Sequence, residues 1–186
     1  MSRLIHLNGP PRVGKSTIAR RYADEHAGTL ALDLDVLAGL IGGWRDDFSA
    51  ALEVARSHGR AMARRHLRDG HDVVIPQLVT VSDRGPGFEE TAKDAGAAYI
   101  EVAMLVDDDE HLRRLRAKCP ANDVETQIQS ILESDDGDLV GRIRRHLSEY
   151  LADRADAVRL DTTGLDQGAT YARLLDVLAG FEQRPA

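Results

Sequence analysis

Short apolar runs alternate along the chain with longer stretches in which apolar residues recur every three or four positions. This alternation is typical of parallel strands connected by covering helices. Gly28, Gly70 and Gly96 close the helices before three of these runs, as C-terminal caps commonly do. The pattern predicts an α/β fold with helices on both faces of a five-stranded parallel sheet. The predicted strands cover residues 4–7, 30–34, 73–75, 99–106 and 157–160.

Residues 9–17 read GPPRVGKST and fit the P-loop pattern of two glycines, a lysine and a hydroxyl at fixed spacing. Glycine allows the tight turn that points successive backbone N–H groups at a bound anion. A helix is predicted over residues 17–26, and its dipole favours a phosphate at its start. The alternative is a glycine turn that precedes Lys and Ser by chance, and the flanking strand and helix argue against it. The predicted nucleotide-binding residues here are Gly9, Pro10, Pro11, Arg12, Val13, Gly14, Lys15, Ser16 and Thr17.

Two carboxylates, Asp33 and Asp35, end the second predicted strand. Alternation along a strand would put both on the same side, near the P-loop. Phosphoryl transfer to a hydroxyl needs such a pair, because one carboxylate can hold Mg²⁺ while the other takes the proton of the acceptor. We expect Ser16 and Asp33 to bind Mg²⁺ and Lys15 to reach the β- and γ-phosphates. Either Asp35 or Asp33 could act as the base. The alternative is that Asp35 only caps a helix over residues 36–41.

With these motifs the chain resembles the P-loop kinases of small molecules, such as shikimate kinase, gluconate kinase and chloramphenicol phosphotransferase. It resembles the tunicamycin-resistance-type proteins most. The resemblance covers nearly the whole chain and rests on GPPRVGKST, on the LDLD pair and on the segment VVIPQLVT of the third strand. It implies a three-layer, nucleoside-kinase-like P-loop NTPase fold with a helical lid, and ATP and Mg²⁺ as cofactors.

The resemblance also implies roles for residues in the second half of the chain. It places the lid at about residues 114–138, where Arg114 would stack on adenine and Lys118 would clamp phosphate. Kinases of this kind often send an arginine from the next helix to the transferred phosphoryl group, and Arg142 is the residue we expect there. Thr163 belongs to a loop that resembles the family's loop beside the adenine. The alternative for the lid arginines is an ordinary solvated helix face.

Composition limits the compartment and the partners. A chain of 186 residues is expected to form one domain, residues 1–186. A net charge of −7 argues against a nucleic-acid partner. No stretch is long and apolar enough to span a membrane and no signal peptide precedes the first strand, so we expect a cytoplasmic protein. Cys119 is the single cysteine, which excludes an internal disulfide.

Together these features predict an ATP- and Mg²⁺-dependent kinase that phosphorylates a hydroxyl of a small molecule, as a monomer or homodimer. By resemblance, the acceptor is an antibiotic or nucleoside-like compound, bound within residues 36–80. Two alternatives stay open: a zeta-toxin-like kinase of a nucleotide sugar, and a regulatory ATPase switch. A switch would favour a Walker B carboxylate after the third strand, where the chain has Pro76 and Gln77 instead. Asp33 would have to supply that function.

Overall fold

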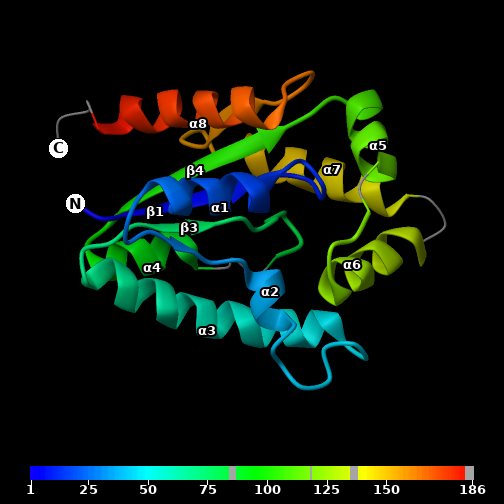
Figure 1. Cartoon of the computed structure of the whole chain (residues 1–186), viewed down its shortest axis with the longest axis horizontal. Coiled ribbons are helices and arrows are strands. Elements are labelled where there is room, and N and C mark those ends of the chain that lie inside the picture. The colour runs from blue at the N-terminus through cyan, green and yellow to red at the C-terminus, as the bar shows by residue number, and fades with distance from the viewer. Residues whose placement is uncertain (84–86, 118, 135–137, 183–186) are drawn as a thin grey trace.

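The computed structural model describes residues 1–83, 87–117, 119–134 and 138–182. Within these residues, five parallel strands form one sheet in the order β2-β3-β1-β4-β5, with helices on both faces (Figure 1). The predicted α/β class and parallel sheet are therefore confirmed. The strands are β1 (Arg3–Asn8), β2 (Leu30–Ala31), β3 (Val73–Ile75), β4 (Ala98–Leu105) and β5 (Val158–Asp161). The helices of the described residues are α1 (Lys15–Glu25), α2 (Leu34–Ala38), α3 (Phe48–Arg68), α4 (Phe88–Ala95), α5 (Asp108–Ala117), α6 (Asp123–Ser134), α7 (Leu139–Ala152) and α8 (Gln167–Glu182).

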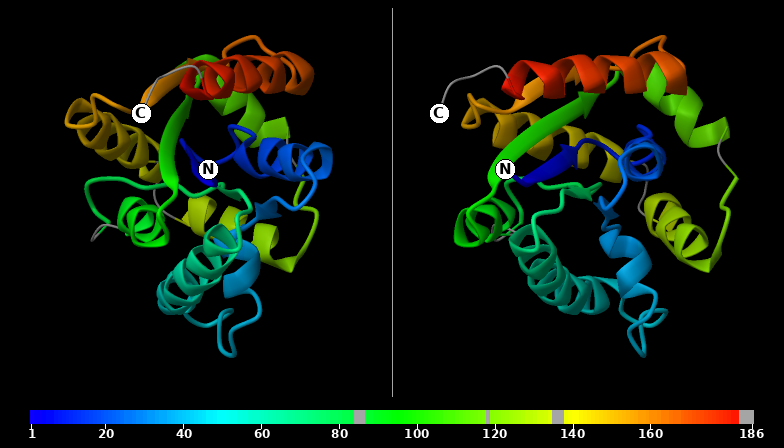
Figure 2. Two further views of the ribbon diagram at one scale, coloured as in Figure 1. Left: turned by 90° about the vertical axis from the view of Figure 1, so that its left-hand side faces the viewer. Right: turned by 60° about the vertical axis from the view of Figure 1, so that its left-hand side comes forward.

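Alternate side chains of the strands build a core on each face of the sheet. Ile5 and the other inward residues of one face pack against α1 and α8, whose Tyr22 and Tyr171 are almost fully buried. On the opposite face, Leu4 packs with residues of α3 and α4, including Phe88. Figure 2 shows α8 and α3 on opposite sides of the strands. No helix in the described part of the chain is both long and apolar enough to cross a membrane.

The second strand is shorter than its sequence suggests. Its ladder ends where the Leu32 N–H donates to a carbonyl of β3 at 2.8 Å, and α2 begins directly after Asp33. The Asp33 side chain accepts a hydrogen bond from the Asp35 N–H at 3.1 Å and so caps the helix. The predicted strand over residues 30–34 is therefore wrong. The alternative that Asp35 caps the following helix is wrong as well, since Asp33 is the N-cap of α2. An aspartate at the N-cap satisfies a helix N–H that otherwise lacks a partner.

Close packing of α2 on α3 fixes the position of both carboxylates. A Cβ atom at Gly59 would lie 2.4 Å from the Cδ2 atom of Leu34, which is fully buried. The missing side chain at Gly59 therefore lets α2 approach α3. Since Asp33 precedes α2 and Asp35 lies in its first turn, this contact sets where both side chains stand relative to the sheet.

The buried amide of Asn8 links the end of β1 to the neighbouring segments. Its Oδ1 atom accepts the N–H groups of Gly9 and Val79 at 2.8 and 2.9 Å. Its Nδ2 atom donates to the Val79 carbonyl and to the carboxylate of Glu101 at 3.1 and 3.0 Å. All hydrogen-bonding positions of the amide are used. The start of the P-loop and the segment after β3 are thus fastened to one side chain.

Glu101 is a buried carboxylate, with only 3% of its surface exposed. Arg154 donates to its Oε2 atom from Nε and Nη2 at 3.2 and 3.1 Å. The hydroxyl of Tyr150 lies 3.4 Å from the same oxygen. A carboxylate is tolerated at such a site only when it is paired and hydrogen-bonded. The Arg154 side chain therefore makes the polar core network stable.

Helices α5 and α6 extend beyond the ends of the strands, where the resemblance predicts a lid (Figure 1). The start of α6 contacts the loop before α3: the Arg45 side chain pairs with Asp123 at 2.5 Å, and Gln127 donates to the Arg45 carbonyl at 3.4 Å. Val124 packs against the cluster that contains the buried Trp44. In this structure, α6 therefore rests against the elements that follow β2.

We predict that replacing Arg154→Met lowers the free energy of unfolding by about 2–4 kcal/mol, because the substitution leaves the Glu101 carboxylate buried without its ion pair. Urea denaturation at pH 7 measures this change. Arg145→Met is the matched control: Arg145 lies 3.9 Å from Asp138 in an exposed pair, and its loss should change the free energy by at most about 0.5 kcal/mol. Equal effects of the two substitutions would contradict the role given to Arg154.

Candidate active site

The P-loop turns between β1 and α1 through backbone conformations that favour glycine. Gly9 has a φ of 144° and Gly14 a φ of 105°. A Cβ atom at Gly9 would lie 2.4 Å from the carbonyl oxygen of Met104 on β4. Gly9 is therefore required both by its backbone angle and by the close approach of β4.

The carbonyl groups of the P-loop are bound by side chains of the same protein. The Lys15 ammonium donates to the carbonyls of Gly9 and Pro10, both at 2.8 Å. From α5, His111 Nε2 donates to the Pro11 carbonyl at 2.8 Å. Because the carbonyls are held in this way, the loop can turn its N–H groups toward an anion at the start of α1.

His111 was missed by the sequence analysis, since nothing in its surroundings along the chain marks it. Arg144 of α7 donates to its Nδ1 atom at 3.1 Å, so the hydrogen of the neutral ring lies on Nε2 and faces the Pro11 carbonyl. Burial lowers the pKa of His111, which favours this neutral form. Arg144 also donates to the Val106 carbonyl at 3.3 Å. The chain of contacts from α7 to α5 thus braces the P-loop from outside.

Lys15 stands near both carboxylates that follow β2. Burial lowers the pKa of its ammonium to about 8, while the charges of Asp35 and Asp33 oppose this shift. Burial likewise raises the pKa of the Asp35 carboxyl to about 6; the charge of Asp33 adds to this shift, and Lys15 and Arg56 oppose it. The structure therefore brings Lys15, Asp33 and Asp35 together, as the sequence predicted, although by a helix cap rather than by strand alternation.

The hydroxyl of Ser16 and the carboxylate of Asp33 are suited to Mg²⁺. Both residues line one cavity of about 230 Å³ between α1, β2 and α2. One Asp33 oxygen accepts the Asp35 N–H, which leaves the other oxygen for a metal. Mg²⁺ in kinases is bound by one or two protein oxygens together with phosphate oxygens. This donor set fits the ion, and among the described residues no group of three or more His, Cys, Asp or Glu side chains competes for it.

Arg114 of α5 joins the P-loop to the loop that follows β5. Its Nη2 atom donates to the carbonyls of Thr162 and Leu165 at 2.7 and 3.3 Å, and its Nη1 atom lies 3.4 Å from the Val13 carbonyl. Glu110 accepts its Nε–H at 2.8 Å. Arg114 is therefore no solvated helix residue. Its stacking on adenine stays a prediction.

Of the other residues given roles by resemblance, the structure describes Thr163 and Arg142. Thr163 Oγ1 accepts the N–H of Asp107, just before α5, at 3.0 Å. Arg142 is half-buried in the first turn of α7, and its role stays a prediction. Lys118 and residues 135–137 of the predicted lid lie outside the described residues.

The region predicted to hold the acceptor contains a second polar cluster. Arg56 of α3 donates to Asp83 and Glu53 at 2.8 and 2.7 Å. Asp83 also accepts the N–H of Thr80 at 2.8 Å. Among the described residues, the buried Nε of Arg56 and the buried Oε1 of Gln77 have no hydrogen-bond partner. The charge of Arg56 also acts on Asp35, where it opposes the rise of the pKa of that carboxyl.

Comparison with known proteins supports the assignment of the fold. The model of a family of AAA domains, AAA_33, matches residues 4–133. The structure of Deinococcus radiodurans tunicamycin resistance protein superposes with a TM-score of 0.61 at 16% identity, over 96% of this chain and 96% of that protein. Thymidylate kinase from Candida albicans gives a TM-score of 0.61 at 11% identity, over 97% of this chain and 92% of the kinase. Shikimate kinase from Bacteroides thetaiotaomicron gives 0.55 at 16% identity, over 96% and 98%. No curated protein sequence matches the chain.

We predict that Asp35→Asn stabilises the protein at pH 8 in the absence of Mg²⁺ and nucleotide. The raised pKa means that ionisation of Asp35 destabilises the folded state. This destabilisation is absent below the unfolded pKa near 4, grows as the pH rises and is complete above about pH 6. The variant should therefore have a higher melting temperature than the wild-type protein at pH 8, and the difference should vanish near pH 3.

Asp161→Asn is the control, because the pKa of Asp161 is shifted in the opposite direction from that of Asp35. Hydrogen bonds from the N–H and the hydroxyl of Thr163 lower the pKa of Asp161, so its charge does not destabilise the folded state and the variant should gain nothing at pH 8. A loss of stability in Asp35→Asn at pH 8 would contradict the placement of Asp35 in a desolvated, negatively charged site.

Proposed function

Because the chain belongs to the AAA_33 family of AAA domains, we propose that it transfers the γ-phosphoryl group of ATP to a hydroxyl of a small molecule. The observation that carries this proposal is the joint placement of Lys15 and Asp35: a cation of the P-loop stands within electrostatic reach of a carboxylate whose pKa is raised to about 6. A phosphate-binding cation beside a proton acceptor is what transfer to a hydroxyl requires.

In this proposal the P-loop residues 9–17 hold the phosphates of ATP. Lys15 leaves the carbonyls of Gly9 and Pro10 and binds the β- and γ-phosphates. Ser16 and Asp33 would hold Mg²⁺, which when bound would offset the charge of the phosphates. Asp33 suits this role better than that of the base because its side chain is already engaged as the cap of α2.

Asp35 is the base in this proposal. Its raised pKa supports the role, since a carboxylate with a pKa nearer neutrality accepts a proton more readily than an ordinary one. It takes the proton of the acceptor hydroxyl as the hydroxyl oxygen attacks the γ-phosphorus. Arg142 contributes positive charge to the transferred group, and Arg114, Thr163 and Lys118 bind the nucleotide on the adenine side.

We favour an antibiotic or nucleoside-like compound as the acceptor. The similarity to the structure of a tunicamycin resistance protein supports this class. The acceptor would lie within residues 36–80, near the buried polar atoms of Arg56 and Gln77. Since the similar structures also include shikimate kinase, the chemistry of the acceptor has to be found by experiment.

The first test is a mass-spectrometric screen of Mg-ATP with pools of antibiotics, nucleosides and hydroxylated metabolites. We expect one class of compound to gain a single phosphoryl group. Lys15→Ala and Asp35→Asn should each reduce the rate by at least about 100-fold, because they remove a phosphate ligand and the base. Lys93→Ala, a change on α4, is the control and should keep the rate. ATP binding without any phosphorylated product would favour a nucleotide-dependent switch instead.

A second test is the pH profile of kcat/KM for Mg-ATP, which reports ionisations of the free enzyme. We expect a bell with an acid limb near pH 6, where Asp35 becomes protonated, and an alkaline limb near pH 8, where Lys15 loses its charge. Lys15→Arg should remove the alkaline limb from the residual activity, because a guanidinium does not titrate in this range. A profile that is flat from pH 5 to pH 9 would contradict both assignments.

A further inference from the structure

Arg12 has a backbone conformation that favours glycine. In the described part of the chain it is the one residue other than glycine with a positive φ, at 64°. A side chain with a Cβ is strained in this left-handed region, whereas glycine enters it freely. Strained residues of this kind persist where the surrounding structure imposes them, and they cluster at functional sites. We therefore expect the side chain of Arg12 to have a function that glycine, which lacks a side chain, could not perform.

The guanidinium of Arg12 is buried but incompletely used. Its side chain is only 7% exposed. The Nη2 atom donates to Gln129 of α6 at 3.1 Å. The Nη1 atom lies 3.9 Å from the carboxylate of Glu125, too far for a hydrogen bond, and has no hydrogen-bond partner among the described residues. A buried donor without a partner is unfavourable, and an added acceptor at this point would relieve it.

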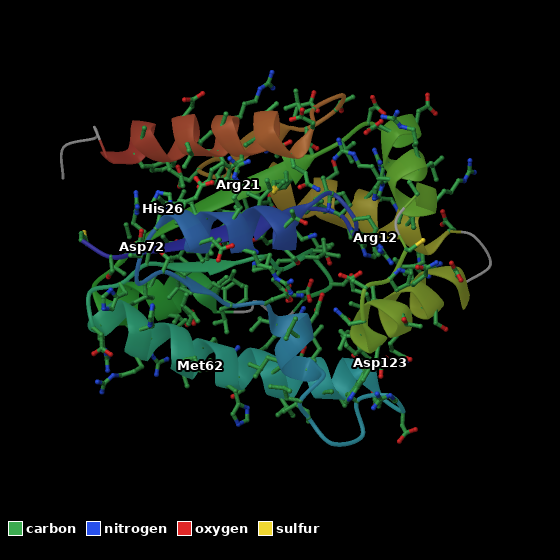
Figure 3. The ribbon with its side chains drawn as sticks, in the orientation of Figure 1. Arg12, Arg21, His26, Met62, Asp72 and Asp123 are labelled. Atoms are coloured by element: carbon green, nitrogen blue, oxygen red, sulfur yellow. The ribbon has the colours of Figure 1, made fainter. Side chains whose placement is uncertain are left out.

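Arg12 belongs to the P-loop, so the acceptor that we infer for its Nη1 atom is a phosphate oxygen. Its side chain lies between the P-loop and α6 (Figure 3). The neighbouring carbonyls of Pro11 and Val13 are bound from α5, so the phosphate-binding N–H groups of the loop face another way. Lys15 supplies positive charge from within the loop, and the Arg12 guanidinium supplies it from the side of α6.

We propose that Arg12 is a further catalytic residue. It donates a hydrogen bond from Nη1 to a non-bridging oxygen of the phosphoryl group during its transfer. This inference rests on the proposed function. Gln129 holds the guanidinium through Nη2, so contact with α6 and neutralisation of the phosphoryl charge occur together. An arginine suits this task because its planar fork stays charged and can bind two oxygens at once.

Arg12 takes no part in the exchange of bonds. The acceptor oxygen forms a bond to the γ-phosphorus, the bond from that phosphorus to the β–γ bridging oxygen breaks, and its electron pair stays on ADP. The acceptor proton goes to Asp35. Arg12 stabilises the charge on the non-bridging oxygens while these bonds change, which is the role of an arginine finger, here supplied by the P-loop itself.

The test compares Arg12→Gly and Arg12→Lys with the wild-type protein in Mg-ATP hydrolysis, with water as the acceptor, and in the binding of Mg-ADP by calorimetry. We expect Arg12→Gly to lower kcat at least about 100-fold while the Kd of Mg-ADP changes by less than about threefold. Its melting temperature should be no lower than that of the wild-type protein, because glycine relieves the strained φ. Arg12→Lys should lose most of the rate as well, since an ammonium lacks the fork.

Two further measurements separate catalysis from a structural tether. Adding guanidinium chloride below its denaturing concentration should restore part of the kcat of Arg12→Gly but none of that of Lys15→Ala. Gln129→Leu removes the contact with α6 and keeps the guanidinium, so it should lower kcat by no more than about fivefold.

The outcomes distinguish a failure of the proposed function from a failure of the role given to Arg12. A wild-type protein that turns over no Mg-ATP, alone or with the acceptors of the screen, would contradict the proposed function. A wild-type protein that is active while Arg12→Gly keeps its kcat within about threefold would contradict only the role of Arg12. Equal losses in Arg12→Gly and Gln129→Leu, without rescue by guanidinium, would make Arg12 a tether of α6 and overturn the proposal.

Discussion

The site depends on one constraint: a loop that turns its N–H groups toward an anion must find partners for its carbonyl groups elsewhere. In this chain, the carbonyls of Gly9 and Pro10 are bound by Lys15, and that of Pro11 by His111. Arg114 adds a longer contact to Val13. Because unpaired carbonyls near the protein interior are unfavourable, the contacts that His111 and Arg114 make from α5 help to hold the P-loop in this shape.

This constraint connects the P-loop to distant parts of the chain. Arg114 contacts both the P-loop and the loop after β5, so the segment predicted to lie beside the adenine and the segment predicted to bind phosphate share one side chain. On the opposite side, Asn8 ties the beginning of the P-loop to Val79, in the segment after β3. The predicted nucleotide site and the predicted acceptor region are therefore in contact through this buried amide.

The same site trades stability for chemistry. Asp33 and Asp35 stand together near the buried ammonium of Lys15. Burial lowers the pKa of Lys15 and raises the pKa of Asp35, so it favours the neutral form of each group. A core of apolar residues at this place would be more stable. The proposed reaction needs the charges, however, because phosphate and Mg²⁺ would complete the set of partners that the protein alone leaves incomplete. The strained backbone of Arg12 and the buried Nη1 donor without a hydrogen-bond partner also cost stability, and in the proposed reaction a phosphoryl oxygen would accept from that donor.

The sequence by itself determined the sheet and the P-loop, because both depend on local patterns: apolar runs of strand length, glycines at sharp turns, and a fixed spacing of Gly, Lys and Ser. It also identified Asp33 and Asp35 as a pair, but it misjudged the backbone that carries them: Asp33 caps a helix instead of continuing the strand, and the packing of that helix on α3 at Gly59 sets where both carboxylates stand. Tertiary structure alone revealed His111, which lies 100 positions from its partner Pro11, and the contact of Arg12 with Gln129. Such contacts join residues far apart in the chain, and their identity depends on how whole elements pack, which no local pattern records.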